Sequence, residues 1–230
     1  MIRVLVDRDG GLRDGEAHHL QVRRAKDGET VELRDGEGLI GMGRALRDGK
    51  SWRIEAIARE RAPRPPSLTL AVGAGDRDRF AWVVEKATEL GVTSVLPFES
   101  ARTAGVATRL RGPHLERLRR HALEAVKQSG AAWAARVEEP ISLAELAARG
   151  LERGGWLADA DGVPVPAHVD DGPLVAVIGP EGGLTPEERE RLLGAGYVAV
   201  RLASHTLRFE TAAVAAAAAA VAGRLRGNHG

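Results

Sequence analysis

Short apolar segments alternate with polar turns along the first 60 residues. Four of them read as β-strands, at residues 3–6, 30–33, 39–42 and 52–57, and Gly and Asp turns separate them. This pattern predicts a small β-barrel. Residues 60–67 then bring three prolines close together, which stiffens the chain and ends a strand ladder. We therefore predict a domain boundary there, with domains at 1–66 and 67–230.

From residue 68 onward, apolar runs alternate with helical patterns. Runs that read as strands lie at 68–72, 92–98, 155–159, 173–179 and 197–203, and a helical pattern follows each of them except the third. The helix at 79–90 carries an apolar stripe that includes Phe80 and Val84, and another helix begins at Pro113. Such alternation predicts a mostly parallel α/β sheet.

The last helix contains eleven consecutive Ala and Val residues, at 212–222. The run is too short to span a bilayer and consists mostly of the best helix former. A helix of small side chains packs closely against a neighbour, so we expect burial or a subunit contact rather than disorder.

Composition narrows the function classes only a little. The chain has 230 residues, 43% of them hydrophobic, and its 33 basic and 32 acidic residues nearly cancel. Net charge therefore gives no argument about a nucleic-acid partner. The absence of cysteine rules out disulfides and thiolate metal sites. No membrane-spanning run or secretion signal is evident, so we expect a cytoplasmic location and no membrane partner.

A glycine-rich loop, "IGPEGG" at 178–183, joins a predicted strand to a helix whose T-x-x-E capping box begins at Thr185. Ligands bind at such strand ends in open α/β sheets. Gly182 and Gly183 let the backbone approach a ligand. No G-x-G-x-x-G pattern or Lys is present, and Glu181 repels phosphate, which favours a neutral or cationic ligand. A plain tight turn explains the loop equally well.

A second strand-end loop lies at 202–214 and carries Arg208, Glu210 and Thr211. Helix capping accounts for Glu210 and Thr211, whereas it does not account for Arg208. Two such loops predict one shared pocket.

The segment "GRALRDGKS" at 43–51 resembles a phosphate-binding loop, but its spacing is one residue too long, so we interpret it as a glycine turn between strands. No metal site is expected, because the histidines lack ligand spacing.

These residues belong to four motifs: "EKATELGV" (85–92), "EAVKQSG" (124–130), "IGPEGG" (178–183) and "LASHTLRFETA" (202–212). Together and in this order they resemble the RsmE family of SPOUT-class methyltransferases, over nearly the whole chain. The chain departs from the family pattern at Ala131, Ala203 and Thr206. The resemblance implies an α/β domain with a parallel sheet and a deep trefoil knot, preceded by a PUA-like β-barrel that binds RNA.

The resemblance also implies the activity and the site. Members of this family methylate the N3 of a uridine in bacterial 16S (small-subunit) ribosomal RNA with S-adenosylmethionine. The implied cofactor-binding residues are Leu157, Ala158, Asp159, Ile178, Gly179, Pro180, Glu181, Gly182, Gly183, Leu202, Ala203, Ser204, Thr206 and Leu207. The candidate contacts to substrate RNA are Arg23, Arg24, Arg102 and Thr211.

Loss of the N3 proton defines the catalytic candidates. Arg208 is expected to stabilise the uracil anion, and Glu210, or a water that it holds, is the candidate base. The expected partners are 16S rRNA or an assembled small subunit, together with a second copy of the chain in a homodimer. Two alternatives remain open: a SPOUT enzyme that methylates the ribose 2′-hydroxyl, and a non-catalytic RNA-binding module.

Overall fold

The computed structural model describes residues 1–49, 51–103, 110–149 and 155–227. It contains two compact units. Unit 1 consists of Met1–Arg64 and Leu123–Ala134, and unit 2 of Pro65–Ala122 and Ala135–Gly230. A segment that follows the prolines in sequence thus belongs to the first unit. The domain boundary expected from the sequence, between residues 66 and 67, stays a prediction.

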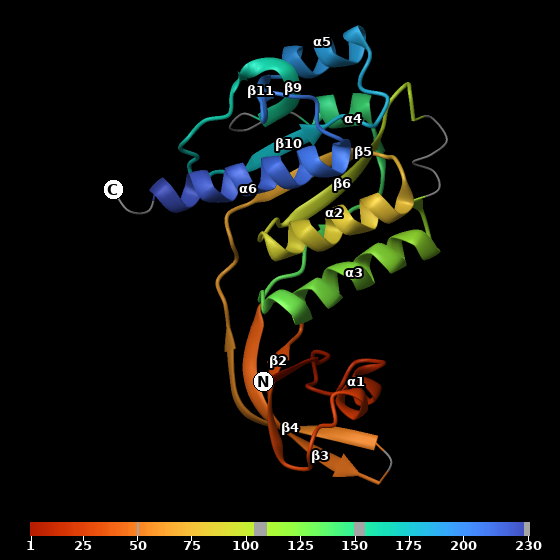
Figure 1. The fold of residues 1–230 in the computed structure, drawn as a ribbon, viewed down its shortest axis with the longest axis vertical. Helices are drawn as coiled ribbons and strands as arrows, with labels where there is room; N and C mark the ends of the chain where they lie inside the picture. The colour runs from red at the N-terminus through yellow and green to blue at the C-terminus, as the bar shows by residue number, and fades with distance from the viewer. Residues whose placement is uncertain (50, 104–109, 150–154, 228–230) are drawn as a thin grey trace. The chain divides into compact units, whose positions relative to one another are not determined.

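Both units contain helices and strands (Figure 1). In chain order they are β1 (Ile2–Leu5), α1 (Glu16–Val22), β2 (Glu29–Arg34), β3 (Leu39–Asp48), β4 (Ser51–Arg61), β5 (Leu68–Gly73), α2 (Arg77–Glu89), β6 (Ser94–Glu99), α3 (Pro113–Ser129), β7 (Arg136–Val137), β8 (Ile141–Ser142), α4 (Leu143–Ala148), β9 (Gly155–Pro164), β10 (Leu174–Ile178), α5 (Pro186–Gly194), β11 (Tyr197–Arg201) and α6 (Phe209–Gly227).

Unit 1 is built on a four-stranded sheet in the order β1-β2-β3-β4. The first pair of strands is parallel and the other two are antiparallel. Alternate side chains of β2 are buried, with Val31 and Leu33 fully inside, as period-two patterning requires. All four strands expected in this region are confirmed. The segment at 43–51, apart from Lys50, which lies outside the described residues, belongs to the β3–β4 hairpin, so the glycine-turn interpretation holds there.

The sequence pattern did not indicate α1. This helix has only seven residues and buries only Glu16 and Leu20, so it carries too little periodicity to be recognised. Arg23 caps its C-terminal end, and Arg24 follows in the left-handed region with φ 55°. Both arginines are exposed. The two RNA-contact candidates of this unit therefore lie at a helix end and not on a strand.

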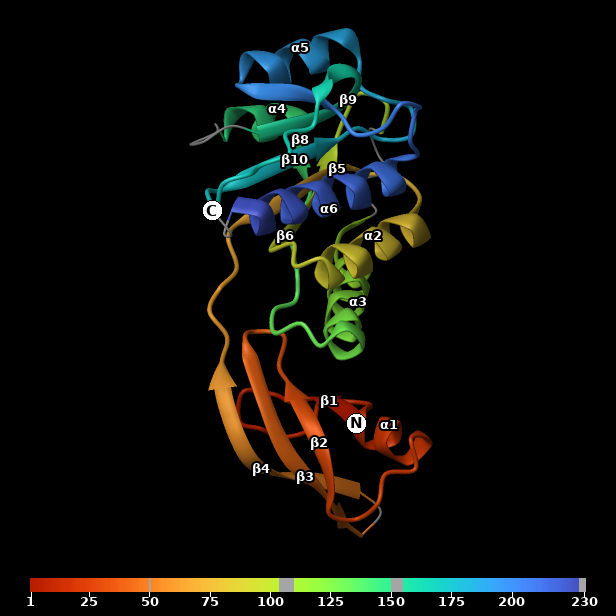
Figure 2. The same ribbon diagram turned by 60° about the vertical axis from the view of Figure 1, so that its left-hand side comes forward.

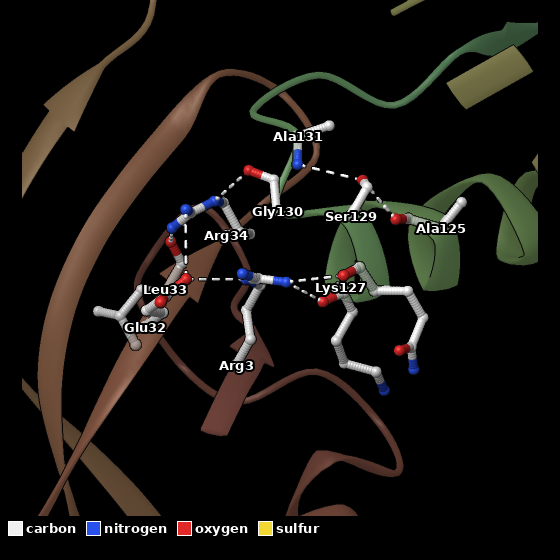
Figure 3. Close-up of polar contacts among 10 residues, drawn as sticks. Arg3, Glu32, Leu33, Arg34, Ala125, Lys127, Ser129, Gly130 and Ala131 are labelled. Carbon is white, nitrogen blue, oxygen red and sulfur yellow. Dashed lines mark hydrogen bonds and ion pairs between the residues drawn. The ribbon is translucent and has the colours of Figure 1, made fainter. Parts of the chain in front are cut away.

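Two arginines of unit 1 bind the carbonyls at the C-terminal end of α3 (Figure 3). Arg3, from β1, donates to the carbonyl oxygens of Lys127 and Gln128, and Arg34, from β2, donates to that of Gly130. The last carbonyls of a helix have no partner within it, and cationic donors favour this end. The segment that carries the "EAVKQSG" motif is therefore fixed within unit 1 by side chains from its two neighbouring strands.

Unit 2 contains a parallel sheet in the order β11-β9-β10-β5-β6-β7, with β8 also pairing with β6. Every pairing in it is parallel. The central strands β5 and β10 are almost wholly apolar and largely buried, as strands covered on both faces must be. The predicted parallel α/β sheet is confirmed.

Helices cover both faces of this sheet. Figures 1 and 2 show α2 and α6 side by side on one face and α4 and α5 on the other, in agreement with their contacts. Ala213, Ala216, Ala217 and Ala220 of α6 are buried. The alanine run therefore packs within its own unit, which agrees with burial, one of the two alternatives expected from the sequence.

The long helices agree with the expected patterns. Phe80, Val83, Val84 and Ala87 form the buried stripe of α2, and α3 begins at Pro113. The short elements β7, β8 and α4 were not predicted, because two to six residues give no recognisable period. Among the residues that the structure describes, no helix has the length and apolar character needed to cross a bilayer.

Candidate functional site

A cavity of about 850 Å³ lies in unit 2 where several parallel strands end. Its walls come from the segments that follow β5, β10 and β11 and from the middle of β9. This is the edge of an open α/β sheet where ligands bind, because each strand there continues into a loop whose composition is free to vary. Both loops singled out in the sequence contribute to this one cavity.

One wall of the cavity is an excursion of β9. Leu157 pairs with Ala199 and Val163 pairs with the next residue, Val200, so residues 158–162 leave the ladder. Gly162 ends the excursion against β11, where a Cβ would lie 2.5 Å from a backbone atom of Ala199. Only glycine fits at that position. The excursion turns the backbone of Ala158–Asp161 toward the cavity, which all four residues line.

An ion pair holds this excursion to α5. Arg189 Nε donates to Asp159 Oδ2 at 2.5 Å, and the N–H of Asp161 donates to the other oxygen at 2.9 Å. Burial raises the pKa of Asp159, but these hydrogen bonds and the charge of Arg189 outweigh it, and the pKa lies below its ordinary value. The carboxylate is therefore ionised at neutral pH and fixes the loop.

The glycine-rich loop after β10 forms a tight turn and also lines the cavity. Gly183 has φ 69° and its N–H donates to the carbonyl of Pro180 at 2.8 Å. The predicted capping box of α5 is present, with Thr185 and Glu188 satisfying each other's backbone groups. A Cβ on Gly73 would lie 2.6 Å from the nitrogen of Pro180. The loop thus lies directly on the end of β5. The tight turn and this close contact account for its glycines, so they do not indicate a phosphate-binding loop.

The loop after β11 ends at the first turn of α6, where Arg208 and Glu210 lie. Arg208 lines the cavity, is exposed, and makes no side-chain hydrogen bond or ion pair with any described residue. Glu210 is not a lining residue; its side chain is 14% exposed. Phe209 between them is buried, with its ring over Gly75. Because Phe209 is buried as the first residue of α6, Arg208 and Glu210 lie on either side of it at the N-terminus of that helix.

The structure brings most of the predicted cofactor residues together. Those that line the cavity are Leu157, Ala158, Asp159, Ile178, Gly179, Pro180, Glu181, Gly183, Leu202, Ala203, Thr206 and Leu207. Gly182 and Ser204 are not lining residues. Among the RNA candidates, Thr211 is exposed on α6, and Arg102 donates to the carbonyl of Gly182. Arg102 therefore already has a partner in the glycine-rich loop.

Sequence reasoning missed several charged lining residues: Asp76, Arg79, Asp161, Arg189, Arg201 and His205. Asp76 and Arg79 follow the end of β5, so the strand-end argument used for the other two loops could have found them. Arg189 gave no such signal. It lies on α5, whose sequence is mainly charged, and it reaches Asp159 because α5 packs against β11, the strand beside β9.

Comparison with known proteins places this fold in a class. Residues 62–221 match the family model described as an RNA methyltransferase domain, and residues 12–44 match the model described as an RNA methyltransferase PUA domain. The fold and its strand-end cavity are therefore those of an RNA methyltransferase with an N-terminal PUA domain. The trefoil knot that the resemblance implies stays a prediction.

Relatives narrow the class to one family. Ribosomal RNA small subunit methyltransferase E of Aquifex aeolicus is 30% identical over 208 residues, covering 88% of this chain and 90% of the relative. The protein of the same name from Mycobacterium bovis is 31% identical over 224 residues, covering 92% and 83%. The chain belongs to the ribosomal RNA small subunit methyltransferase E family.

A solved structure shares the whole fold. The ribosomal RNA small subunit methyltransferase E of Neisseria gonorrhoeae, bound to S-adenosyl methionine, superimposes with a TM-score of 0.83 at 28% identity, covering 95% of this chain and 96% of that one. The predicted fold class, a SPOUT-type parallel α/β domain preceded by a PUA-like domain, is confirmed.

Proposed function

We propose that this chain transfers a methyl group from S-adenosylmethionine to the N3 of a uridine in 16S ribosomal RNA of the small subunit. The observation that carries the proposal is Arg208, a cation with no partner among the described residues, which faces a cavity at the strand ends. The names of the relatives and the cofactor bound by the Neisseria gonorrhoeae protein support the same reaction.

The residues of the cavity fit this cofactor. Its volume of about 850 Å³ lies within the range of ligand pockets. Small residues such as Ala158, Gly179 and Ala203 line it, so backbone groups are open to hydrogen bonding. Four carboxylates and four arginines line it, so the lining has no excess of either charge, and a sulfonium cation or an amino group can lie beside a carboxylate such as Asp161. The predicted cofactor-binding residues would hold it here, with Gly182 and Ser204 supporting the two loops from outside the lining.

S-adenosylmethionine supplies an electrophilic methyl group on a positively charged sulfur, and loss of that methyl leaves a neutral thioether. The protein must do the rest. Arg208 donates hydrogen bonds to a uracil oxygen and stabilises the negative charge that develops as N3 loses its proton. Glu210 receives that proton through a water that it holds, since Glu210 itself is not a lining residue and its side chain is 14% exposed.

The RNA is held by basic and polar groups outside the cavity. We assign Arg23 and Arg24 of the 1–66 domain, and Arg102 and Thr211 of the 67–230 methyltransferase domain, to this contact. Arg102 must release the carbonyl of Gly182 to serve it, which makes it the weakest of the four. Binding should weaken as salt rises, because phosphate contacts release counterions. The partners we propose are the small subunit or its RNA and a second copy of the chain, in the cytoplasm.

The first experiment is methylation of small subunits from a strain that lacks the gene, followed by mass spectrometry of the nucleosides. N3-methyluridine is the expected product. A 2′-O-methyl nucleoside would overturn the base-anion mechanism, and cofactor binding without any product would favour an RNA-binding module. Arg208→Ala should lower turnover by about a hundredfold or more with nearly unchanged cofactor affinity, whereas Arg226→Ala, an exposed arginine at the other end of α6, should change neither.

The homodimer needs a separate measurement. Light scattering after gel filtration should give twice the monomer mass of 24.4 kDa. A monomer that is fully active would remove the partner copy from the proposal while leaving the reaction in place.

A further inference from the structure

Arg79, in the first turn of α2, lies between two carboxylates of the cavity region. Its Nη1 is 2.5 Å from Glu181 Oε1, in the glycine-rich loop, and its Nε is 3.9 Å from Glu210 Oε1, at the start of α6. Arg79 itself lines the cavity. One guanidinium, with five donors in a rigid plane, therefore joins the two loops that follow β10 and β11.

The Glu210 carboxylate has few other contacts. Its Oε2 has almost no accessible surface and no hydrogen-bond partner among the described residues. A buried carboxylate oxygen without a donor is unfavourable by more than an ordinary unpaired polar group. The carboxylate is thus held mainly by its position at a helix N-terminus and by Arg79.

Other charges near the start of α6 are already engaged or lie elsewhere. Asp76 accepts from the N–H groups of Asp78 and Arg79, and Asp78 pairs with Arg117 at 3.1 Å. The strands β5 and β10, against which α6 packs, carry no charged residue. Within the described part of the chain, Arg79 is the cation found within 4 Å of Glu210. Arg77 and Arg208 make no ion pair there.

We propose that Arg79 is a positioning residue for methyl transfer, which holds Glu210 at the edge of the cavity and links it to the loop that carries Glu181. The 3.9 Å separation is longer than a hydrogen bond, so the guanidinium is shared unequally and favours Glu181. A cationic ligand that binds the Glu181 carboxylate would weaken the ion pair between Arg79 and Glu181. Arg79 could then move within hydrogen-bond distance of Glu210. The inference rests on the proposed function, in which Glu210 is the proton acceptor.

The test is a double-mutant cycle on turnover with saturating S-adenosylmethionine and small subunits. Arg79→Gln should lower kcat by about ten- to a hundredfold, with a much smaller change in KM for the subunit. In a Glu210→Gln background the same substitution should cost less than about twofold, because the group through which it acts is gone. Arg79→Lys keeps the charge but not the two-sided geometry, and should recover part of kcat.

Arg77→Gln is the matched control. It removes the same charge from the same helical turn, two residues earlier, and Arg77 is exposed. Its kcat should equal that of the wild type. Thermal unfolding of each variant, and its calorimetric affinity for S-adenosylhomocysteine, separate a folding or cofactor defect from a defect in turnover.

The outcomes distinguish the two proposals. Wild-type protein that forms no N3-methyluridine would end the proposed function, and this inference with it. An active wild type in which Arg79→Gln and Glu210→Gln multiply independently would overturn only the role of Arg79. Equal losses in Arg79→Gln and Arg77→Gln would show a general effect of charge, and would overturn it as well.

Discussion

A buried ion pair in unit 1 gives the sharpest stability prediction. Lys127, in the "EAVKQSG" motif, places Nζ 2.8 Å from Glu16 Oε1, and the two side chains are 9% and 3% exposed. Burial lowers the pKa of Lys127, but hydrogen bonds to Glu16 and Glu124 outweigh it and leave the pKa above its ordinary value. Lys127 is therefore charged across the physiological range.

The perturbation is Lys127→Met, which keeps the length of the side chain and removes its charge. Glu16 Oε2 already has no partner among the described residues, so the variant leaves the whole carboxylate buried without a cation. Removing one partner of a buried pair costs about 3–5 kcal/mol. That is a large share of the roughly 5–15 kcal/mol that stabilises an ordinary domain.

Two further variants separate the pair from its surroundings. Lys127→Met combined with Glu16→Leu should recover most of the loss, since apolar residues of similar volume replace buried ion pairs at little cost. Glu124→Gln is the control: Glu124 binds the same Nζ at 2.9 Å but is 57% exposed, so its loss should cost less than about 1 kcal/mol.

Urea unfolding, followed by circular dichroism and tryptophan fluorescence, measures all three variants. Trp52 belongs to the core of unit 1 and reports on it. A loss below about 1 kcal/mol for Lys127→Met, or a double variant no more stable than the single one, would refute the reasoning. The pair would then be solvated in solution, and the motif would need another explanation.

Three other outcomes are expected. Arg224→Met should lower the unfolding free energy measured in urea by about 3 kcal/mol, because the buried guanidinium donates to four carbonyls; Arg226→Met, at an exposed arginine of the same helix, should leave it unchanged. The ion pair of Asp159 and Arg189 should contribute its full stabilisation at pH values above about 3.9, the pKa of an aspartate in the unfolded chain, and this stabilisation should be lost as the pH falls through the lower pKa of folded Asp159. Affinity for S-adenosylhomocysteine should therefore stay constant between pH 7 and pH 5, and a decline over that range would contradict the prediction. Gly73→Ala should weaken that affinity about tenfold or more, since its Cβ would meet the backbone of the glycine-rich loop; unchanged calorimetric affinity would show that the loop moves freely.

The order and type of the long elements follow from the sequence. The stripe of α2, the start of α3 at a proline and the capping box at Thr185 all depend on residues within one or two helical turns of one another. Local periodicity and capping act over that range. Two strand-end loops likewise indicated one pocket, because parallel strands end at a common edge.

The partners across the fold follow only from the tertiary structure. Glu16 meets Lys127 across 111 residues of sequence, and Arg79 meets Glu181 across 102. Neither pairing has a local signal, since each depends on which elements pack together. The excursion of β9 is of the same kind: the sequence pattern predicted a strand at 155–159, and only the register with β11 shows that 158–162 leave the ladder.

The sequence by itself thus determined the long helices and strands, the class of fold and two of the loops from which the cavity is built. The tertiary structure decided which charges face one another. Apolar periodicity depends only on residues that are close together in the sequence, so it can be recognised without the fold. An ion pair between distant residues depends on strand order and helix packing. That is why Arg208 could be singled out from its loop, whereas the contacts of Arg79 with Glu181 and Glu210 became visible only in the tertiary structure.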